Sequence, residues 1–153
     1  MGFFKSTFGK PLIVENDFFG QMRFNEDREA QDKSYFACKR HFKPADKIIE
    51  IGIDGIASGP TEKQIAFFKQ VEEHYPEIAA SIIPLIEEEF RNRKKNFQIV
   101  HFKKEFDPVY LRLPACESVP IIWEIAFESE HDKNHTFTLV MNDYDAKELL
   151  IDG

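Results

Sequence analysis

The hydrophobic pattern of the chain changes from strand-like to helix-like and back again. Between Thr61 and Lys95 the apolar residues recur at the spacing of a helix, about 3.6 residues. Before and after this block they come in short runs, separated by residues that favour turns. The pattern therefore predicts strands, then a central helical block, then strands again.

The central block predicts two helices. Thr61 and Gln64 have the spacing of a capping box, so we expect the first helix to begin there. Tyr75-Pro76 should end it, because the residue before a proline is disfavoured in helix. Pro76 suits the first position of a second helix, in which Pro84 predicts a kink or a new start. The residues expected to face the core are Ile65, Phe68, Val71, Tyr75, Ile78, Ile82, Leu85, Ile86 and Phe90.

Five strands are predicted before the helices: one at Phe3-Phe4, one at 12–14, and one each over 18–24, 34–42 and 47–56. Gly20 within the third predicts a bulge or a close approach of two backbones. In the fifth, three isoleucines alternate with Glu50, Gly52 and Asp54, so we expect the isoleucines to face inward and the other three outward.

The second half of the chain predicts a further meander of strands. Residues 97–106 favour neither helix nor strand, whereas 109–113, 121–127, 136–141 and 146–151 favour strands. A polar connection is expected over 128–134 and a turn over 142–145. The predicted fold is α+β, with antiparallel β-meanders before and after a two-helix block packed on the sheet. We expect a single globular domain over residues 1–153.

Composition indicates a cytoplasmic protein rather than a membrane protein. The chain of 153 residues is 42% hydrophobic with 16 Phe, but its mean hydropathy is −0.41 and its charges are scattered. Cys38 and Cys116 lack the paired spacing of a zinc site and are expected to be buried thiols, with a disulfide left open. No secretion signal is apparent. The first six residues fit an N-myristoylation pattern, but Phe3 and Phe4 also suit the start of a buried strand, which is the interpretation we favour.

Negative charge is concentrated in the last third of the chain. Residues 1–60 hold nine acids and nine bases, residues 61–95 hold seven and six, and residues 96–153 hold eleven and five. The net charges are thus 0, −1 and −6. Such a surface repels nucleic acid and attracts basic proteins, or it serves only to keep the protein in solution. The residues expected to bind a partner, displayed in neighbouring loops, are Glu128, Glu130, Asp132, Asp143, Asp145 and Glu148.

One loop has the residue types of a metal site. Glu128, Glu130, His131 and His135, with Asp107 as a further candidate, offer carboxylates and imidazoles. Their spacing matches no known site, and a polar hairpin loop is the simpler interpretation. The chain also lacks a glycine-rich phosphate loop and a nucleophile elbow. We therefore expect no cofactor, no metal and no catalytic residue.

Several short segments resemble those of a family of small bacterial proteins. The segments are Phe8-Gly9-Lys10-Pro11-Leu12, Phe19-Gly20, Gln64, Trp123-Glu124-Ile125-Ala126-Phe127-Glu128, Glu130-His131, Phe137, Val140 and Asp152-Gly153. In these features the chain is similar to proteins of unknown function that resemble the immunity proteins of polymorphic toxin systems. The resemblance implies a protein-binding role and carries over no active site.

Two hypotheses follow from the sequence. The first is an immunity-type protein that neutralises a cognate bacterial toxin by direct contact, its acidic meander facing a basic toxin domain. The alternative is a small metal-assisted hydrolase, or a housekeeping enzyme of unknown substrate. Under the first hypothesis we expect the protein to bind another protein, and to bind neither nucleic acid nor a membrane.

Overall fold

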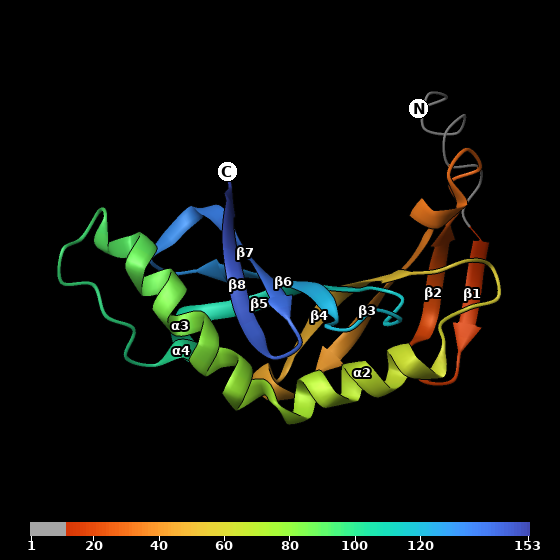
Figure 1. Ribbon diagram of the computed structural model, residues 1–153, viewed down its shortest axis with the longest axis horizontal. Helices are drawn as coiled ribbons and strands as arrows, with labels where there is room; N and C mark the ends of the chain where they lie inside the picture. The colour runs from red at the N-terminus through yellow and green to blue at the C-terminus, as the bar shows by residue number, and fades with distance from the viewer. Residues whose placement is uncertain (1–11) are drawn as a thin grey trace.

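The computed structural model describes residues 12–153, which form one eight-stranded sheet with helices on one side (Figure 1). The strands are β1 (Leu12–Asn16), β2 (Gly20–Asn25), β3 (Tyr35–Phe42), β4 (Lys47–Asp54), β5 (Phe106–Leu113), β6 (Ile122–Ser129), β7 (Asp132–Asn142) and β8 (Asp145–Asp152). The α-helices are α2 (Glu62–Glu73), α3 (Tyr75–Arg91) and the single turn α4 (Phe102–Glu105). Two 3-10 turns, η1 (Gln31–Lys33) and η2 (Lys43–Ala45), flank β3. The strand predicted at Phe3-Phe4 and the acylation pattern lie outside the described residues.

The strands lie in the sheet in the order of the chain, from β1 at one edge to β8 at the other. Every neighbouring pair is antiparallel except β4 and β5, which are parallel. A parallel pair needs a connection that returns along the sheet, and α2 and α3 lie in that connection. The α+β fold is confirmed, and its strands form a single sheet that is mostly antiparallel.

The helix starts follow the sequence pattern closely. Thr61 Oγ1 accepts a hydrogen bond from Gln64 N at 3.2 Å, and Gln64 Oε1 accepts one from Thr61 N at 2.9 Å, so the predicted capping box is confirmed. The second helix, α3, does begin at Tyr75-Pro76. It then continues through Pro84 to Arg91 without a new start. Pro84 is exposed, so its ring is directed away from the packed side of the helix.

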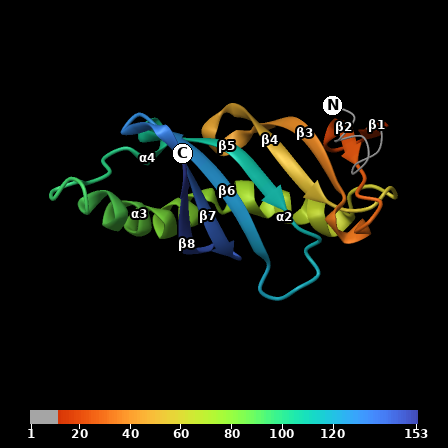
Figure 2. The ribbon, with the colours of Figure 1, turned by 90° about the horizontal axis from the view of Figure 1, so that it is seen from above.

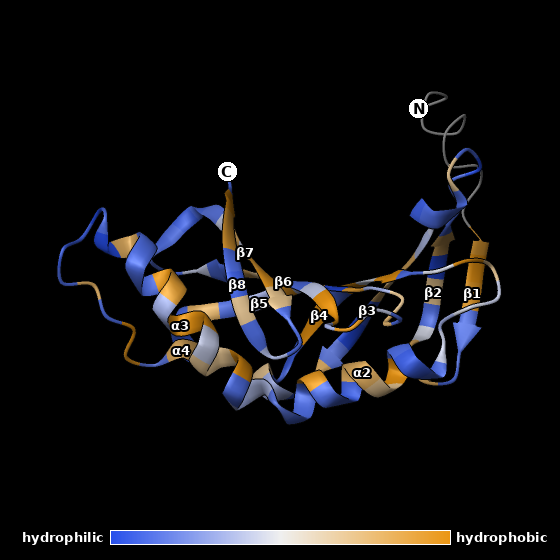
Figure 3. Cartoon of the chain, in the orientation of Figure 1, coloured by the Kyte–Doolittle hydropathy of each residue, from blue (hydrophilic) through white to orange (hydrophobic). Residues whose placement is uncertain are grey.

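The helices cover one side of the sheet and bury most of their apolar residues there (Figures 1 and 3). Apolar residues, orange in Figure 3, recur between hydrophilic ones along α2 and α3. The predicted inward positions hold except at Ile65 and Leu85, which are half-buried, while Phe67 is buried instead. Ser81 of α3 also fixes this layer by accepting a hydrogen bond from Ala146 N of β8 at 3.0 Å.

Four of the five strands predicted before the helices are present as β1 to β4. The third is shorter than expected, because Phe18 and Phe19 lie in the turn that precedes it. Asn16 Oδ1 accepts hydrogen bonds from the backbone nitrogens of both phenylalanines at 2.9 Å. Gly20 then begins β2 with a φ of 76°, a conformation that glycine adopts without strain. Gly20 therefore ends a turn and is not a bulge.

One segment of the second half differs from the prediction, and another had no predicted element. The connection expected over 128–134 is only two residues long, because β6 extends to Ser129 and β7 begins at Asp132. Within 97–106 the chain forms a loop, then the short helix α4, and then enters β5 at Phe106. The hydrophobic pattern did not show the end of β6, the start of β7 or the start of β5. These positions depend on pairing with neighbouring strands and on the burial of single residues such as Phe106.

The side chain of Trp123 lies in the core, as predicted from its strand. It is 1% exposed, and its ring packs edge to face against Phe67 of α2, with the centroids 5.7 Å apart. The indole Nε1 donates a hydrogen bond to the backbone oxygen of Asp143 at 2.7 Å. Of the two free cysteines, Cys38 is buried and Cys116 is half-buried. Within residues 12–153 the structure contains no helix with the length and apolarity needed to span a membrane.

Candidate interaction surface

The face of the sheet opposite α2 and α3 has no helix over it in the described part of the chain, and we call it the open face (Figure 2). Figure 2 looks onto it, with the two helices behind the strands. In Figure 1 the strands at both edges, β1–β2 and β7–β8, rise on this side, so the open face is concave. Its side chains alternate with buried ones. In β4 the three isoleucines predicted to face inward are 2% exposed or less.

A hollow of about 890 Å³ lies on the open face over β2 to β5. Its floor includes Ala37 and Gly52, the smallest side chains of β3 and β4, which are cross-strand partners. Tyr110 of β5 leans across β4 above Gly52, where an added Cβ would overlap the phenol oxygen. Because Gly52 has no side chain, the ring of Tyr110 can lie close against the sheet.

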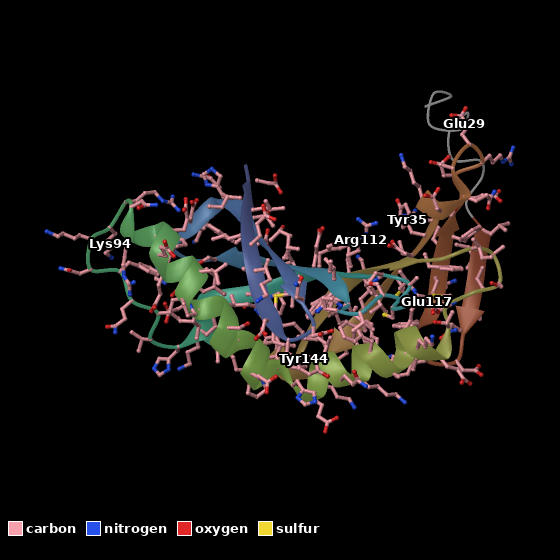
Figure 4. The ribbon with its side chains drawn as sticks, viewed as in Figure 1. Glu29, Tyr35, Lys94, Arg112, Glu117 and Tyr144 are labelled. Carbon is pink, nitrogen blue, oxygen red and sulfur yellow. The ribbon has the colours of Figure 1, made fainter. Side chains whose placement is uncertain are left out.

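The polar groups beside Tyr110 are held by one ion pair. Arg112 Nε and Nη2 donate to the two carboxylate oxygens of Asp54 at 3.3 and 3.2 Å. The hydrogen bond to Asp54 raises the pKa of Arg112, so its charge is fixed. Burial raises the pKa of Tyr110, the Arg112 cation acts against this, and the carboxylates of Asp54 and Glu124 add to it. Tyr110 is thus a neutral phenol among fixed charges. Figure 4 shows Tyr35 and Arg112 on the side of the sheet away from the helices.

Two further carboxylates flank Tyr110 without an ion-pair partner. Glu50 is the cross-strand partner of Tyr110 and of Lys39, and Glu124 is the partner of Arg112. Neither carboxylate lies within 4.0 Å of a cationic nitrogen among residues 12–153. Arg112 is therefore hydrogen-bonded to Asp54, but its charge also interacts with that of Glu124, its cross-strand partner, and Glu50 lies opposite Lys39.

Exposed apolar side chains are spread over the open face. Five strands each have a large hydrophobic residue that is at least 36% exposed and that strand pairing places on this side of the sheet. These residues are Ile13, Tyr35, Ile48, Ile122 and Leu150. A single exposed apolar residue is normal, and these five are separated from one another; together they place apolar side chains on five of the eight strands of the open face.

The open face is acidic over β6 to β8. Five acids occupy its register positions there, namely Glu124, Glu128, Asp145, Glu148 and Asp152. Among the residues of those three strands that have a cross-strand partner on this face, none is a lysine or an arginine. By contrast the hollow over β2 to β5 also has cations, among them Arg23 and Lys39. The charge of the open face is therefore negative at one end and mixed at the other.

The six acids predicted as the partner surface are not brought together in neighbouring loops. Glu128, Glu130 and Asp132 lie at one end of β7, whereas Asp143 and Asp145 lie at the other. A strand advances about 3.3 Å per residue, so the two ends of β7 are roughly 30 Å apart. Glu128, Asp145 and Glu148 have the register of the open face, since Asp145 is the cross-strand partner of Asn142, and Asn142 is that of Ile122.

Two of these six acids have structural bonds instead. Asp132 accepts from Arg93 Nη1 at 2.9 Å and contacts His135 Nδ1 at 2.8 Å, and its side chain is only 9% exposed. The hydrogen bonds from Arg93 and His135 lower the pKa of Asp132 to about 2, against the opposing effect of burial. Asp143 Oδ1 accepts from Ile121 N at 3.0 Å in the β7–β8 turn. Glu130 and Asp145 are exposed in their turns.

The residues of the metal-site alternative are also dispersed. His131 Nε2 is paired with Glu105 Oε1 at 2.7 Å, and His135 is paired with Asp132. Asp107 forms an ion pair with Lys47, and Glu128 is exposed on β6. Residues 12–153 contain no group of three or more His, Cys, Asp or Glu side chains placed to hold a metal ion.

Sequence reasoning missed the centre of the open face. Tyr110 and Arg112 alternate with the buried Leu111 and Leu113, so the outward positions of this strand could have been identified. The pairing of Arg112 with Asp54 could not, because it depends on the parallel contact between β4 and β5. Comparisons of the chain with protein-family models, with curated proteins and with solved structures found no match.

Proposed function

We propose that this protein is an immunity-type binding protein, which neutralises a cognate bacterial toxin by direct contact through its open face. The observation that carries the proposal is the set of exposed apolar residues on a concave sheet face, around the half-buried Tyr110 and the paired Arg112. Tyrosine and arginine are enriched among the residues that dominate binding energy at protein interfaces. The face thus offers anchors at its centre and charge around them.

The charge of the open face supports a basic partner. The acids of β6 to β8 give one end of the face a negative field, which accelerates association with a positively charged protein and sets its orientation. A toxin domain that binds nucleic acid or another anionic substrate has such a basic surface. An acidic protein that covered this basic surface would keep the toxin from its substrate and so inhibit it.

The test uses the product of the gene adjacent to the one encoding this protein. Both proteins are purified, mixed at micromolar concentration and assayed for a complex, and association rates are then measured by stopped flow at low and high salt. Charge reversal at Glu124, Glu128 and Glu148 should slow association about tenfold at low salt and reduce its salt dependence. Glu88→Lys, exposed on α3 in the other layer, is the matched control and should leave the rate nearly unchanged.

Each result bears on a different part of the proposal. Absence of a complex contradicts the immunity function. A complex that is indifferent to the open-face reversals, and to Tyr35→Ala, contradicts the open face as the interface. A second hollow of about 670 Å³, between the α2–α3 junction and α4, would then be the next surface to test; it is lined by Tyr75, Val100 and Phe102 among others.

A further inference from the structure

We propose that the outer edge of β8 binds an extended segment of the partner, which adds to the sheet as a further antiparallel strand and alternates basic with apolar side chains. The inference rests on the proposed function and deepens it, because it identifies the kind of segment by which a basic partner is recognised. β8 is the last strand of the sheet at the acidic end of the open face.

The outer edge of β8 has backbone groups to which another strand can bind. In an antiparallel sheet, successive residues of a strand direct their N–H and C=O groups to one neighbour and then to the other. Asp143 N donates to Ile121 O at 2.8 Å, so the odd-numbered residues 137 to 141 of β7 face β6. Leu149 and Ile151 are paired with two of these residues, so their own backbone groups face away from β7. Such groups on an edge strand are a template for another chain.

Helix α3 covers only the start of this edge. Ser81 Oγ accepts a hydrogen bond from Ala146 N at 3.0 Å. Outside the strand pairing, the backbones of Leu149 and Ile151 make no hydrogen bond with another residue of the range 12–153. In Figure 1 the C-terminal end of β8 rises on the open side, away from α3. The edge over residues 148–152 is therefore accessible to another strand.

The middle of this stretch has apolar side chains on both sides of the sheet. Leu149 and Ile151 lie on the helix side and are only half-buried, because β8 has a neighbouring strand on one side alone. Leu150 lies on the open face and is 41% exposed. An added strand would cover all three side chains, so its residues opposite them should be apolar.

The charges at the two ends of this stretch favour a basic strand. Glu148 and Asp152 lie on the open face, and their partners on β7 are the uncharged Val140 and Thr136. Neither acid lies within 4.0 Å of a cationic nitrogen among residues 12–153. The one base of β8, Lys147, lies before this stretch, where the register shifts. Lysine or arginine opposite the two acids would form favourable cross-strand pairs.

The same charges disfavour a second copy of this chain as the occupant. When two copies of β8 pair antiparallel through Leu149 and Ile151, Leu150 lies opposite Leu150 of the other copy. Glu148 of each copy then lies opposite Asp152 of the other, and like charges in directly opposite positions destabilise a strand pair. A basic strand has the opposite effect, and its cations lie beside the acids of the open face.

The first experiment uses a synthetic strand. Acetyl-Thr-Lys-Val-Leu-Val-Lys-Thr-amide places lysines opposite the two acids, leucine opposite Leu150 and valines opposite Leu149 and Ile151. It is titrated into the isotopically labelled protein to about 5 mM and followed by NMR, since binding near the millimolar range is expected for a short peptide. The amide protons of Leu149 and Ile151 should shift downfield and exchange more slowly with water. The peptide with glutamate in place of both lysines should bind at least about fivefold more weakly.

Two methylated peptides test whether the backbone is bound. N-methylation of both valines removes the N–H groups that are directed at β8, so it should abolish the changes. N-methylation of the leucine removes an N–H group that points away from β8, so it should weaken binding no more than about twofold. No binding of the parent peptide at the highest concentration, or equal loss with the two methylated peptides, would overturn the proposal.

Variants of the protein then identify the groups responsible. Glu148→Lys combined with Asp152→Lys should weaken binding of the lysine peptide at least about fivefold and strengthen that of the glutamate peptide, an exchange that unfolding cannot produce. Ile151→Pro should abolish binding, because it removes an outward N–H group without removing a bond to β7. The amide spectrum checks that this variant is folded. Glu130→Lys, in the exposed β6–β7 turn, is the control and should leave binding unchanged.

The complex separates this inference from the proposed function. If the adjacent gene product binds, Ile151→Pro should weaken the complex at least about tenfold, mainly through faster dissociation. A complex that tolerates this change overturns the edge as the binding site while leaving the immunity function standing. Conversely, a protein that binds the lysine peptide but forms no complex contradicts the immunity function alone. A dimer of the free protein that Ile151→Pro abolishes would assign the edge to a second copy and overturn the proposal.

Discussion

The side-chain amide of Gln64 donates a hydrogen bond from Nε2 to the backbone oxygen of Asp54 at 2.7 Å, from the first turn of α2 to the last residue of β4. The same nitrogen donates to the backbone oxygen of Pro114 at 2.9 Å, just beyond β5. Gln64 is 1% exposed, and its oxygen accepts from Thr61. One buried side chain thus joins the helix start to the ends of both parallel strands.

Gln64→Ala should lower the free energy of unfolding by about 2 to 4 kcal/mol, because it leaves buried backbone groups without their partners. The measurement is denaturant unfolding. Gln70→Ala is the matched control on the same helix, since Gln70 is exposed and accepts only a long hydrogen bond of 3.3 Å from Tyr144. Equal losses in the two variants would show that the buried bonds of Gln64 are not responsible.

Thr61→Ala should lower the free energy of unfolding by about 0.5 to 2 kcal/mol, because it removes the side-chain oxygen that caps Gln64 N at the start of α2. Thr61→Ser keeps this oxygen and should retain most of the stability. The same denaturant titration measures both variants. An unchanged midpoint for the alanine variant would contradict the contribution of the cap.

Stability should fall in acid through Glu105 and Asp132. Burial alone would raise the pKa of Glu105, but hydrogen bonds from His101 N, the side chain of His131 and Val100 N lower it. The pKa of Asp132 is lowered to about 2. A carboxylate with a lowered pKa stabilises the fold at pH values above its pKa in the unfolded chain, which is near 4, and this stabilisation is lost as the pH falls through its pKa in the folded protein, about 2 for Asp132.

The pH dependence can be assigned with variants. Unfolding free energies are measured by urea titration between about pH 6 and pH 2. Glu105→Gln should be less stable than the wild type at neutral pH and should show a shallower loss in acid. Glu130→Gln, an exposed neighbour in the β6–β7 turn, should follow the wild-type curve. A wild-type slope in the Glu105 variant would exclude this carboxylate as a source of the acid sensitivity.

The fluorescence of Trp123, the single tryptophan, should be blue-shifted in the folded protein relative to free tryptophan in water, because the indole is buried against Phe67. Trp123→Phe should reduce stability, since Asp143 then loses the donor to its backbone oxygen. Emission at the wavelength of free tryptophan, without a further red shift on unfolding, would contradict the buried position.

The features that could be predicted from the sequence are those set by residues close together in the chain. Thr61 with Gln64, the turn at Asn16 and the alternation around Ile51 are each set by residues a few positions apart, and each was predictable. The parallel contact of β4 with β5 was not, because nothing near Glu50 or Tyr110 encodes their pairing. The open face depends on that contact, so its central residues were beyond sequence reasoning.

The predicted acidic surface shows the same limit. Charge counting identified the segments rich in acids, but it could not show on which side of the sheet each acid lies or which residues it contacts. Asp132 has an arginine from α3 beside it, and Asp143 completes a turn with its side chain. Glu124, which sequence reasoning did not select, does face the open side. Sequence reports how much charge a segment carries, whereas register and packing determine where that charge acts.

The parallel pairing of β4 with β5 also has a kinetic consequence. Within each set of four strands, β1 to β4 and β5 to β8, neighbours are joined by short connections, whereas Glu50 and Tyr110 are 60 positions apart (110 minus 50). Contacts between distant residues form late, because a long loop must close first. The hollow lies across this junction, so it forms only when both halves have joined. Any molecule that bound in the hollow would therefore stabilise the contact between the two halves.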